Sequence, residues 1–418
     1  MSNFWQRKVA REDAGTDIVP DNTELPLESV EGVLSEVASD TAVIDQQDNE
    51  AALLTEDADE TDAQYEAIDA DVKAADAGEE GVEEDIPEDA VEQIDVAQES
   101  VRRRWGLNNR QTLARESYGT ANRRKAVRES LWDDIKAFFR RIWEWLKTQG
   151  RKIKDRWINF HNQGKSIQKR SKKFDAAIRL LGSKKSGQDD LKGAFIKQLT
   201  VSGAFVGDNV TVLNTHLTNS GGLPAGVEGM MKTAEAAVTT LAGSSNSAPE
   251  VLAKTNFSTV ASHVGTYGKA GLHEELGGRA VKVEVEGEDW SISFIDSEKD
   301  VPTDVSTPSI ANLNSLNTFY NKLGIEVEKR AKAYEKVNAT REKFETAIEK
   351  LLTKIDKIDA KDNEAFIEAV RKTRTEVSKV TSVVGTLERV QANTITCLTS
   401  GVNGYLSAGI AAYDKRKS

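Results

Sequence analysis

Apolar residues recur at steps of three and four over two long stretches near the end of the chain. The first stretch covers residues 310–355 and the second residues 366–398, with a polar break between them. This spacing places the apolar side chains on one face of a helix. Thr307 followed by Pro308 is a favourable start for the first helix, because proline is preferred at the first helical position. We therefore expect two helices, each about 70 Å long.

Helices of this length are typical of an antiparallel hairpin or coiled coil, here in residues 307–418. We expect these helices also to support self-association. Residues 401–412 are small and apolar, and residues 415–417 are basic. We expect this end to dock on the rest of the protein. The alternative is a tip that contacts another copy or a membrane.

A second helical pattern lies in residues 100–182, where five of the seven tryptophans occur. Ser130, three residues before Asp133, has the spacing of a helix N-cap. Gly150 predicts a break or bend, after which a second helix runs from residue 151 to about residue 181. Both are expected to be basic amphipathic helices. The first helix has an apolar stripe of Leu131, Ile135, Phe138, Phe139, Ile142, Trp145 and Leu146, and the second one of Ile153, Trp157, Phe160, Ile167, Phe174, Ile178 and Leu181.

Residues 183–306 are richer in Gly, Ser, Thr and Asn. Around residues 281–295, Val and aromatic residues alternate with charged residues and serines on both sides of a Gly-Glu-Asp turn, which predicts a β-hairpin. We expect further strands over residues 195–199 and 205–213. Short helices are expected over residues 230–241 and 249–263. Together these elements predict a small α+β domain.

The first 99 residues show no sustained hydrophobic period and are rich in Asp, Glu, Ala and Val. Such a segment buries too little apolar surface to offset the entropy of ordering it, so we expect a disordered acidic arm. The expected fold class is mostly α with a small α+β domain, preceded by this disordered arm, with basic amphipathic helices and a long C-terminal helical hairpin. The expected segments are residues 1–99, 100–182, 183–306 and 307–418.

Charge reverses sign abruptly along the chain. Residues 1–100 hold 31 Asp and Glu against 4 Lys and Arg, a net charge of −27, whereas residues 101–180 hold 23 Lys and Arg against 7 Asp and Glu, a net charge of +16. The other 238 residues sum to −1, so the overall charge of −12 describes no part of the molecule. Removal of the acidic arm would leave a basic protein.

Three interpretations of the basic segment remain open. In the first, its aromatic residues form a helical core and its charged face is solvated. In the second, its cations neutralise phosphates of double-stranded DNA without recognising a base sequence. In the third, its Trp-rich face lies on a membrane. The Arg-rich stretch 101–128 lacks an apolar face, which favours nucleic acid over membrane. The candidate nucleic-acid-binding residues are Arg102, Arg103, Arg104, Arg110, Arg123, Arg124, Lys125, Arg140, Arg141, Lys169, Arg170, Lys172 and Lys173.

Signals of catalytic or metal chemistry are missing from the sequence. Cys397 is the single cysteine, which excludes an internal disulfide and a cysteine-rich zinc site. The glycine pairs at 221–222 and 277–278 lack the Lys and Ser/Thr of a phosphate loop, so we expect turns. His216, His263 and His273 are too widely spaced to form a ligand pair on one helix. We expect no catalytic residue, metal or cofactor, and no transmembrane helix, because no apolar run reaches about 18 residues.

Short tripeptides that end in Glu occur near the charge reversal. Glu99-Ser100 follows Ala97, Glu116-Ser117 follows Ala114, and Glu36 follows Leu34. In layout the N-terminal region of about 180 residues resembles the internal head, or inner body, proteins of large tailed bacteriophages. Maturation proteases of those phages cut after Glu with a small or aliphatic residue two positions earlier.

The resemblance implies a virion structural protein whose acidic propeptide is cut off at Glu36, Glu99 or Glu116. Cutting after Glu99 would leave residues 100–418 with a net charge of +15. The implied partners are the maturation protease, capsid or inner-core proteins, and packaged DNA. The implied location is the capsid interior, after assembly in the host cytoplasm. The alternative is a membrane-interacting or host-delivered effector that uses the basic Trp-rich helices and the long hairpin.

Overall fold

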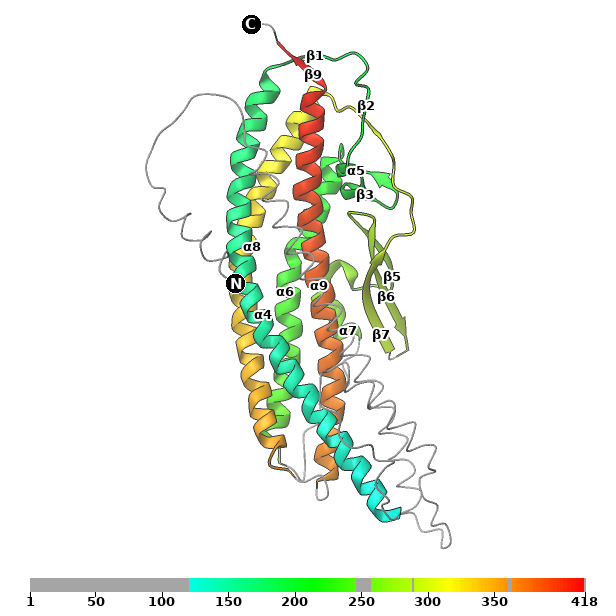
Figure 1. The fold of residues 1–418 in the computed structure, drawn as a ribbon, viewed down its shortest axis with the longest axis vertical. Helices are drawn as coiled ribbons and strands as arrows, with labels where there is room; N and C mark the ends of the chain where they lie inside the picture. The colour runs from blue at the N-terminus through cyan, green and yellow to red at the C-terminus, as the bar shows by residue number, and fades with distance from the viewer. Residues whose placement is uncertain (1–119, 246–256, 288, 359–362, 417–418) are drawn as a thin grey trace, which may run out of the picture. The chain divides into compact units, whose positions relative to one another are not determined.

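A computed structural model describes residues 120–245, 257–287, 289–358 and 363–416. All of these belong to one compact unit that spans Ala38–Ser418. Four long helices dominate it: α4 (Thr120–Arg179), α6 (Val210–Gly243), α8 (Ile310–Ile355) and α9 (Glu364–Ala411). Helix α8 packs along α4 on one side and along α6 on another, and α6 packs also on α9 (Figure 1). The prediction of a mostly helical fold with small β-sheets is confirmed.

Helix α4 is one continuous helix of 60 residues, so of the predicted break or bend at Gly150 the break is wrong, and so is the prediction of two separate helices. The predicted N-cap at Ser130 is wrong as well, because Ser130 lies inside the helix. A glycine inside a helix costs about 1 kcal/mol, and packing along a partner outweighs it. Here α8 supplies that partner, and its Arg341 donates a hydrogen bond of 2.9 Å to the Leu146 carbonyl of α4. The axis of α4 changes direction along its length in Figure 1.

Two long C-terminal helices are confirmed, as α8 and α9. The cap of α8 differs from the prediction, since Ser309 is the N-cap and its hydroxyl accepts from the Asn312 N–H at 3.1 Å. Thr307 instead donates to the Gln188 carbonyl beside the short strand β8 (Val305–Ser306), and Pro308 packs beside Gly409 at the end of α9. Because the chain is still paired as an extended strand up to Thr307, the helix begins only after this pairing ends.

Residues 195–213 do not form the predicted strands. Phe195–Gln198 is the short helix α5, and α6 begins at Val210, with the Asn209 side chain accepting from the Val212 N–H at 3.3 Å. Only two-residue strands lie between them, β3 (Thr200–Val201) and β4 (Ala204–Phe205). The helix predicted over residues 230–241 is confirmed as part of α6.

The predicted hairpin is confirmed as β6 (Arg279–Glu286) and β7 (Asp289–Asp296). A third strand, β5 (Gly271–Glu275), pairs with β6 to give the antiparallel order β5-β6-β7. The turn between β5 and β6 is the expected one at Gly277 and Gly278, which have φ values of +83° and +69° that only glycine adopts easily. The inner face of this sheet carries Val281, Val283, Trp290, Ile292 and Phe294, all buried.

Short elements complete the unit. Helix α7 (Phe257–Val264) and the 3₁₀ turn η2 (Gly265–Tyr267) match the end of the helix predicted over residues 249–263, and residues 249–256 lie outside the described part. Strand β2 (Asp190–Leu191) pairs with β8. Strand β1 (Leu181–Lys184), which follows α4, pairs with β9 (Tyr413–Lys415), which follows α9.

The end of α9 docks on the body of the protein, as predicted for residues 401–412. Gly401 lies against Leu199, and Gly404 lies against Phe195 of α5. The ring of Tyr405 stacks on that of Phe195 at 5.4 Å between centroids. Two apolar clusters fill the bundle along its length, one around Trp132 and Phe344 and one around Ile167 and Leu398.

Candidate functional site

The tryptophan-rich face of α4 points into the protein. Trp132, Phe138 and Trp145 belong to the first apolar cluster and are almost fully buried against residues of α8 and α9. The second half of the helix buries Ile167 and Ile178 in the other cluster. The described part of the predicted stripe is therefore the core-facing side, and the described basic side chains lie on the outer sides of the helix.

Two of the predicted nucleic-acid-binding arginines are engaged in ion pairs. The Arg140 guanidinium lies 3.1 Å from Asp356, and Arg141 lies 3.6 Å from Glu144. Arg170 is half-buried over the ring of Phe174, and burial lowers its pKa. Each of these three cations thus already has a partner within the protein.

Three other candidates, Lys169, Lys172 and Lys173, are exposed on the second half of α4, and Lys165 is exposed beside them. Arg123, Arg124 and Lys125 belong to α4, in a stretch where only the backbone is described. The remaining candidates lie outside the described residues: Arg102, Arg103, Arg104 and Arg110, together with the cleavage-junction residues Glu36, Glu99, Ser100, Glu116 and Ser117.

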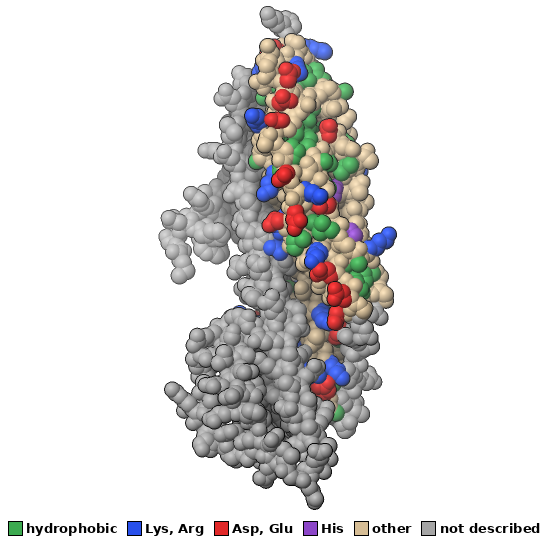
Figure 2. Space-filling model, turned by 90° about the vertical axis from the view of Figure 1, so that its right-hand side faces the viewer, with side chains coloured by type: hydrophobic (Ala, Val, Ile, Leu, Met, Phe, Trp, Pro, Cys, Tyr) green, Lys and Arg blue, Asp and Glu red, His purple; other side chains and the backbone are tan. Residues whose placement is uncertain are grey.

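Charge is mixed on the side of the protein that carries the sheet. Figure 2 shows acidic and basic side chains interspersed over its described residues. Several are paired, as in Arg279–Asp296 at 2.7 Å and Lys282–Glu284 on the sheet. This face lacks a single sign of charge, in contrast to the second half of α4.

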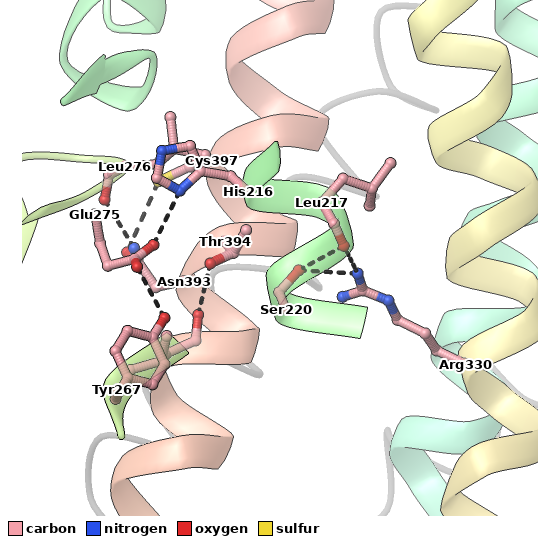
Figure 3. A network of polar contacts seen from close by, with 11 residues as sticks. His216, Leu217, Ser220, Tyr267, Glu275, Leu276, Arg330, Asn393, Thr394 and Cys397 are labelled. Atoms are coloured by element: carbon pink, nitrogen blue, oxygen red, sulfur yellow. Dashed lines mark hydrogen bonds and ion pairs between the residues drawn. The ribbon is translucent and has the colours of Figure 1, made fainter. Parts of the chain in front are cut away.

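A buried carboxylate joins the sheet to the helices. Glu275, at the end of β5, is 5% exposed and accepts a hydrogen bond of 2.8 Å from the Tyr267 hydroxyl of η2 (Figure 3). Its other oxygen lies 3.1 Å from Nδ1 of His216 on α6. Burial and the Glu275 charge both raise the pKa of Tyr267, so its hydroxyl remains a donor. One side chain thereby links β5, η2 and α6.

The next two residues extend this link to α9. Asn393 donates from Nδ2 to the Leu276 carbonyl at 2.8 Å. A Cβ on Gly277 would lie 2.8 Å from the Cys397 sulfur, so only glycine fits there. Burial, followed by the nearby Glu275 charge, raises the pKa of Cys397 to about 12. The thiol therefore stays protonated near neutral pH and is a packing group, because the thiolate is the reactive form.

Arg330 of α8 holds the same stretch of α6 from the opposite side, as Figure 3 shows. It is 5% exposed, and its Nη2 donates to the Leu217 carbonyl at 2.7 Å and to the Ser220 hydroxyl at 2.8 Å. Burial lowers its pKa to about 10. Pro224 lies four residues after Ser220 and has no N–H for the carbonyl of Ser220. Arg330 thus binds the turn of α6 directly before the one that the proline weakens.

These contacts are suited to fixing helices and sheet to one another. The three histidines whose side chains are described are apart from each other: His216 faces Glu275, the His273 ring lies 2.8 Å from the Lys269 carbonyl, and His263 packs on Gly229. Within the described residues no group of three or more His, Cys, Asp or Glu side chains is arranged to hold a metal ion. No described helix combines the length and apolar character needed to cross a bilayer.

Sequence comparison adds one match. A family model described as phiKZ-like phage internal head proteins matches residues 39–399. No curated protein and no solved structure matches the chain.

Proposed function

The chain belongs to the family of phiKZ-like phage internal head proteins, and we propose that in this setting it is a non-enzymatic structural protein activated by proteolysis. The family places it in the interior of the phage head. In this proposal the maturation protease removes the acidic N-terminal region after a Glu, at Glu99 or Glu116. The basic segment that follows then associates with packaged DNA, or with proteins of the inner core.

The charge reversal at residue 100, together with the orientation of α4, carries the proposal. The described part of the apolar stripe of α4 faces the core, so its cations are what this part of the helix offers to a partner. A membrane-bound helix would need Trp132, Phe138 and Trp145 at the surface, and this burial argues against the membrane alternative. Neutralising phosphates with Lys and Arg needs no base-specific contact.

Masking by the arm follows from its tether. At physiological salt, electrostatic interactions are screened over about 8 Å, so free acidic peptides compete poorly with DNA. An arm with a net charge of −27 on the same chain remains close to the +16 segment at any dilution. Cleavage removes this local competitor, and the remaining chain has a net charge of +15.

Protein extracted from mature phage heads should begin at Ser100 or Ser117. The measurement is N-terminal sequencing, or the intact mass, of the protein from purified particles. Substitution of both Glu99 and Glu116 by Gln should abolish cutting at these two junctions, so that the mature protein no longer begins at Ser100 or Ser117. A mature protein that begins at Ser2 would exclude propeptide removal.

Removal of the arm should turn a weak DNA binder into a strong one. The full chain is folded with a specific protease site inserted between Glu99 and Ser100, then cut in place, and the arm is separated in high salt. Before cutting we expect weak binding to a double-stranded DNA fragment, and afterwards an affinity at least about tenfold higher that falls steeply with salt. Equal affinities before and after cutting would contradict masking.

A further inference from the structure

Formal charge is distributed very unevenly along the helix bundle. Around the second apolar cluster, the bundle is built from residues 210–217 of α6, 310–327 of α8 and 395–412 at the end of α9, together with the second half of α4. Those three segments contain only two charged residues, Lys322 and Glu326. Charge at this end of the helices therefore comes mainly from α4.

The second half of α4 is strongly basic. Residues 163–179 hold six Lys and Arg and one acidic residue, Asp175, which pairs with Arg179 at 2.7 Å. Lys165, Lys169, Lys172 and Lys173, hereafter the lysine row, are all exposed. Among the described residues, no ion pair involves any of the four. They differ in this from Arg140 and Arg141, which are paired.

The lysine row lies on one face of α4. Its members are spaced by four, three and one residues, so their side chains fall within about a third of the helix circumference. The opposite face is the buried one, where Gly164 contacts Gly324 of α8 and the Ser171 hydroxyl donates to Asn317 of α8 at 2.9 Å. The lysines are exposed beside this contact, and the nearest carboxylate of α8, Glu328, accepts a hydrogen bond of 3.0 Å from Gln168.

We propose that the lysine row is the contact that binds the phosphate backbone of double-stranded DNA, independently of sequence. This inference rests on the proposed function, which it makes specific to four residues. The row extends over about 12 Å of helix axis. The same length of duplex carries about seven phosphates, so each lysine finds a phosphate within reach of its flexible side chain. Arg140, which pairs with Asp356, and Arg141, which pairs with Glu144 of α4 itself, make no essential contact with DNA.

The test measures how the DNA affinity of the cut protein depends on salt. Each phosphate contact adds about 0.9 to the slope of the logarithm of the binding constant against the logarithm of salt concentration. Replacement of the whole lysine row by Gln should reduce this slope by about 3 and lower the affinity at 0.1 M salt by at least about tenfold. Circular dichroism and a thermal melt show that the variant is folded.

A matched variant removes four exposed cations that are ion-paired. Its substitutions to Gln are at Arg140, Arg141, Lys232 and Lys329. Both variants have the same net charge, so a change in slope of less than about 1 in this control shows that position, and not total charge, matters. An equal loss of slope in both variants, or an unchanged slope in the lysine-row variant, overturns the inference alone. If the cut wild-type protein does not bind DNA at all, the proposed function itself fails.

Discussion

Replacement of Gly164 by alanine will weaken the packing of α4 on α8 and lower the free energy of unfolding by about 3 kcal/mol. A Cβ at this position would lie 2.6 Å from the Gly324 carbonyl oxygen and 2.9 Å from the Glu328 backbone nitrogen. Both are backbone atoms of α8, which cannot rotate away as a side chain does. Relief therefore requires the two helices to separate, and overpacking of this kind typically costs about 1–3 kcal/mol or more. Urea denaturation followed by circular dichroism measures the loss.

Gly222 provides the matched control for this substitution. It lies inside a long helix, is exposed, and has no atom within 4 Å of the position that a Cβ would occupy. Alanine is preferred over glycine in a helix by about 1 kcal/mol, so Gly222→Ala should stabilise the protein slightly. If Gly164→Ala lowers the free energy of unfolding and Gly222→Ala raises it, the close contact of Gly164 with α8 is the cause of the loss. Unchanged stability of Gly164→Ala would show that α4 and α8 are not in this close contact.

The same contact explains why the continuity of α4 escaped sequence analysis. Local rules penalise a glycine inside a helix, and Gly150 therefore predicted a break. The helix continues because its apolar stripe matches α8 along both halves, and because Gly164 and Gly324 let the two backbones approach. Sequence pattern showed which residues of α4 face inward, but the partner that holds them lies far along the chain, as Gln168 and Glu328 show with a separation of 160 positions.

Helix α6 shows the same failure, because the turn expected at Gly221 and Gly222 is wrong and both glycines lie inside this helix. Its first residues are β-branched and its middle contains Gly221, Gly222 and Pro224, all unfavourable in an isolated helix. The structure compensates with contacts from distant residues, including Arg330 at Leu217 and Ser220. By contrast, α8 and α9 were predictable, since each has a long apolar period and contains no proline.

The candidate site was predictable only in part. Composition shows that residues 101–180 are basic, and periodicity shows which side of α4 is apolar. Whether a given cation is available to a partner depends on what lies opposite it after folding. Arg140 finds Asp356 across 216 positions of sequence, whereas Lys169 is exposed and forms no ion pair among the described residues. This difference between the two cations depends on tertiary contacts and could not be predicted from the sequence.

Replacement of Glu275 by leucine should destabilise the protein by about 3 kcal/mol. Leucine fills a similar volume but accepts no hydrogen bond, so the Tyr267 hydroxyl and the His216 ring lose their partner inside the protein. Each buried polar group without a partner costs about 1–3 kcal/mol. Glu275→Gln keeps an acceptor for Tyr267, and we expect it to cost only about 1 kcal/mol. Urea denaturation of both variants gives the comparison.

A double-mutant cycle with Tyr267→Phe separates the lost hydrogen bonds from altered packing. Tyr267→Phe alone leaves Glu275 short of one donor and should be destabilising. Added to Glu275→Leu, however, it removes the hydroxyl that the leucine has left without an acceptor, so the double variant should be less destabilised than the two single effects predict. Since Glu275 joins the sheet to α6 and, through Leu276, to α9, hydrogen exchange should accelerate first in β5 and β6. Strictly additive free energies, with exchange unchanged in these strands, would mean that the buried carboxylate does not anchor the sheet on the helices.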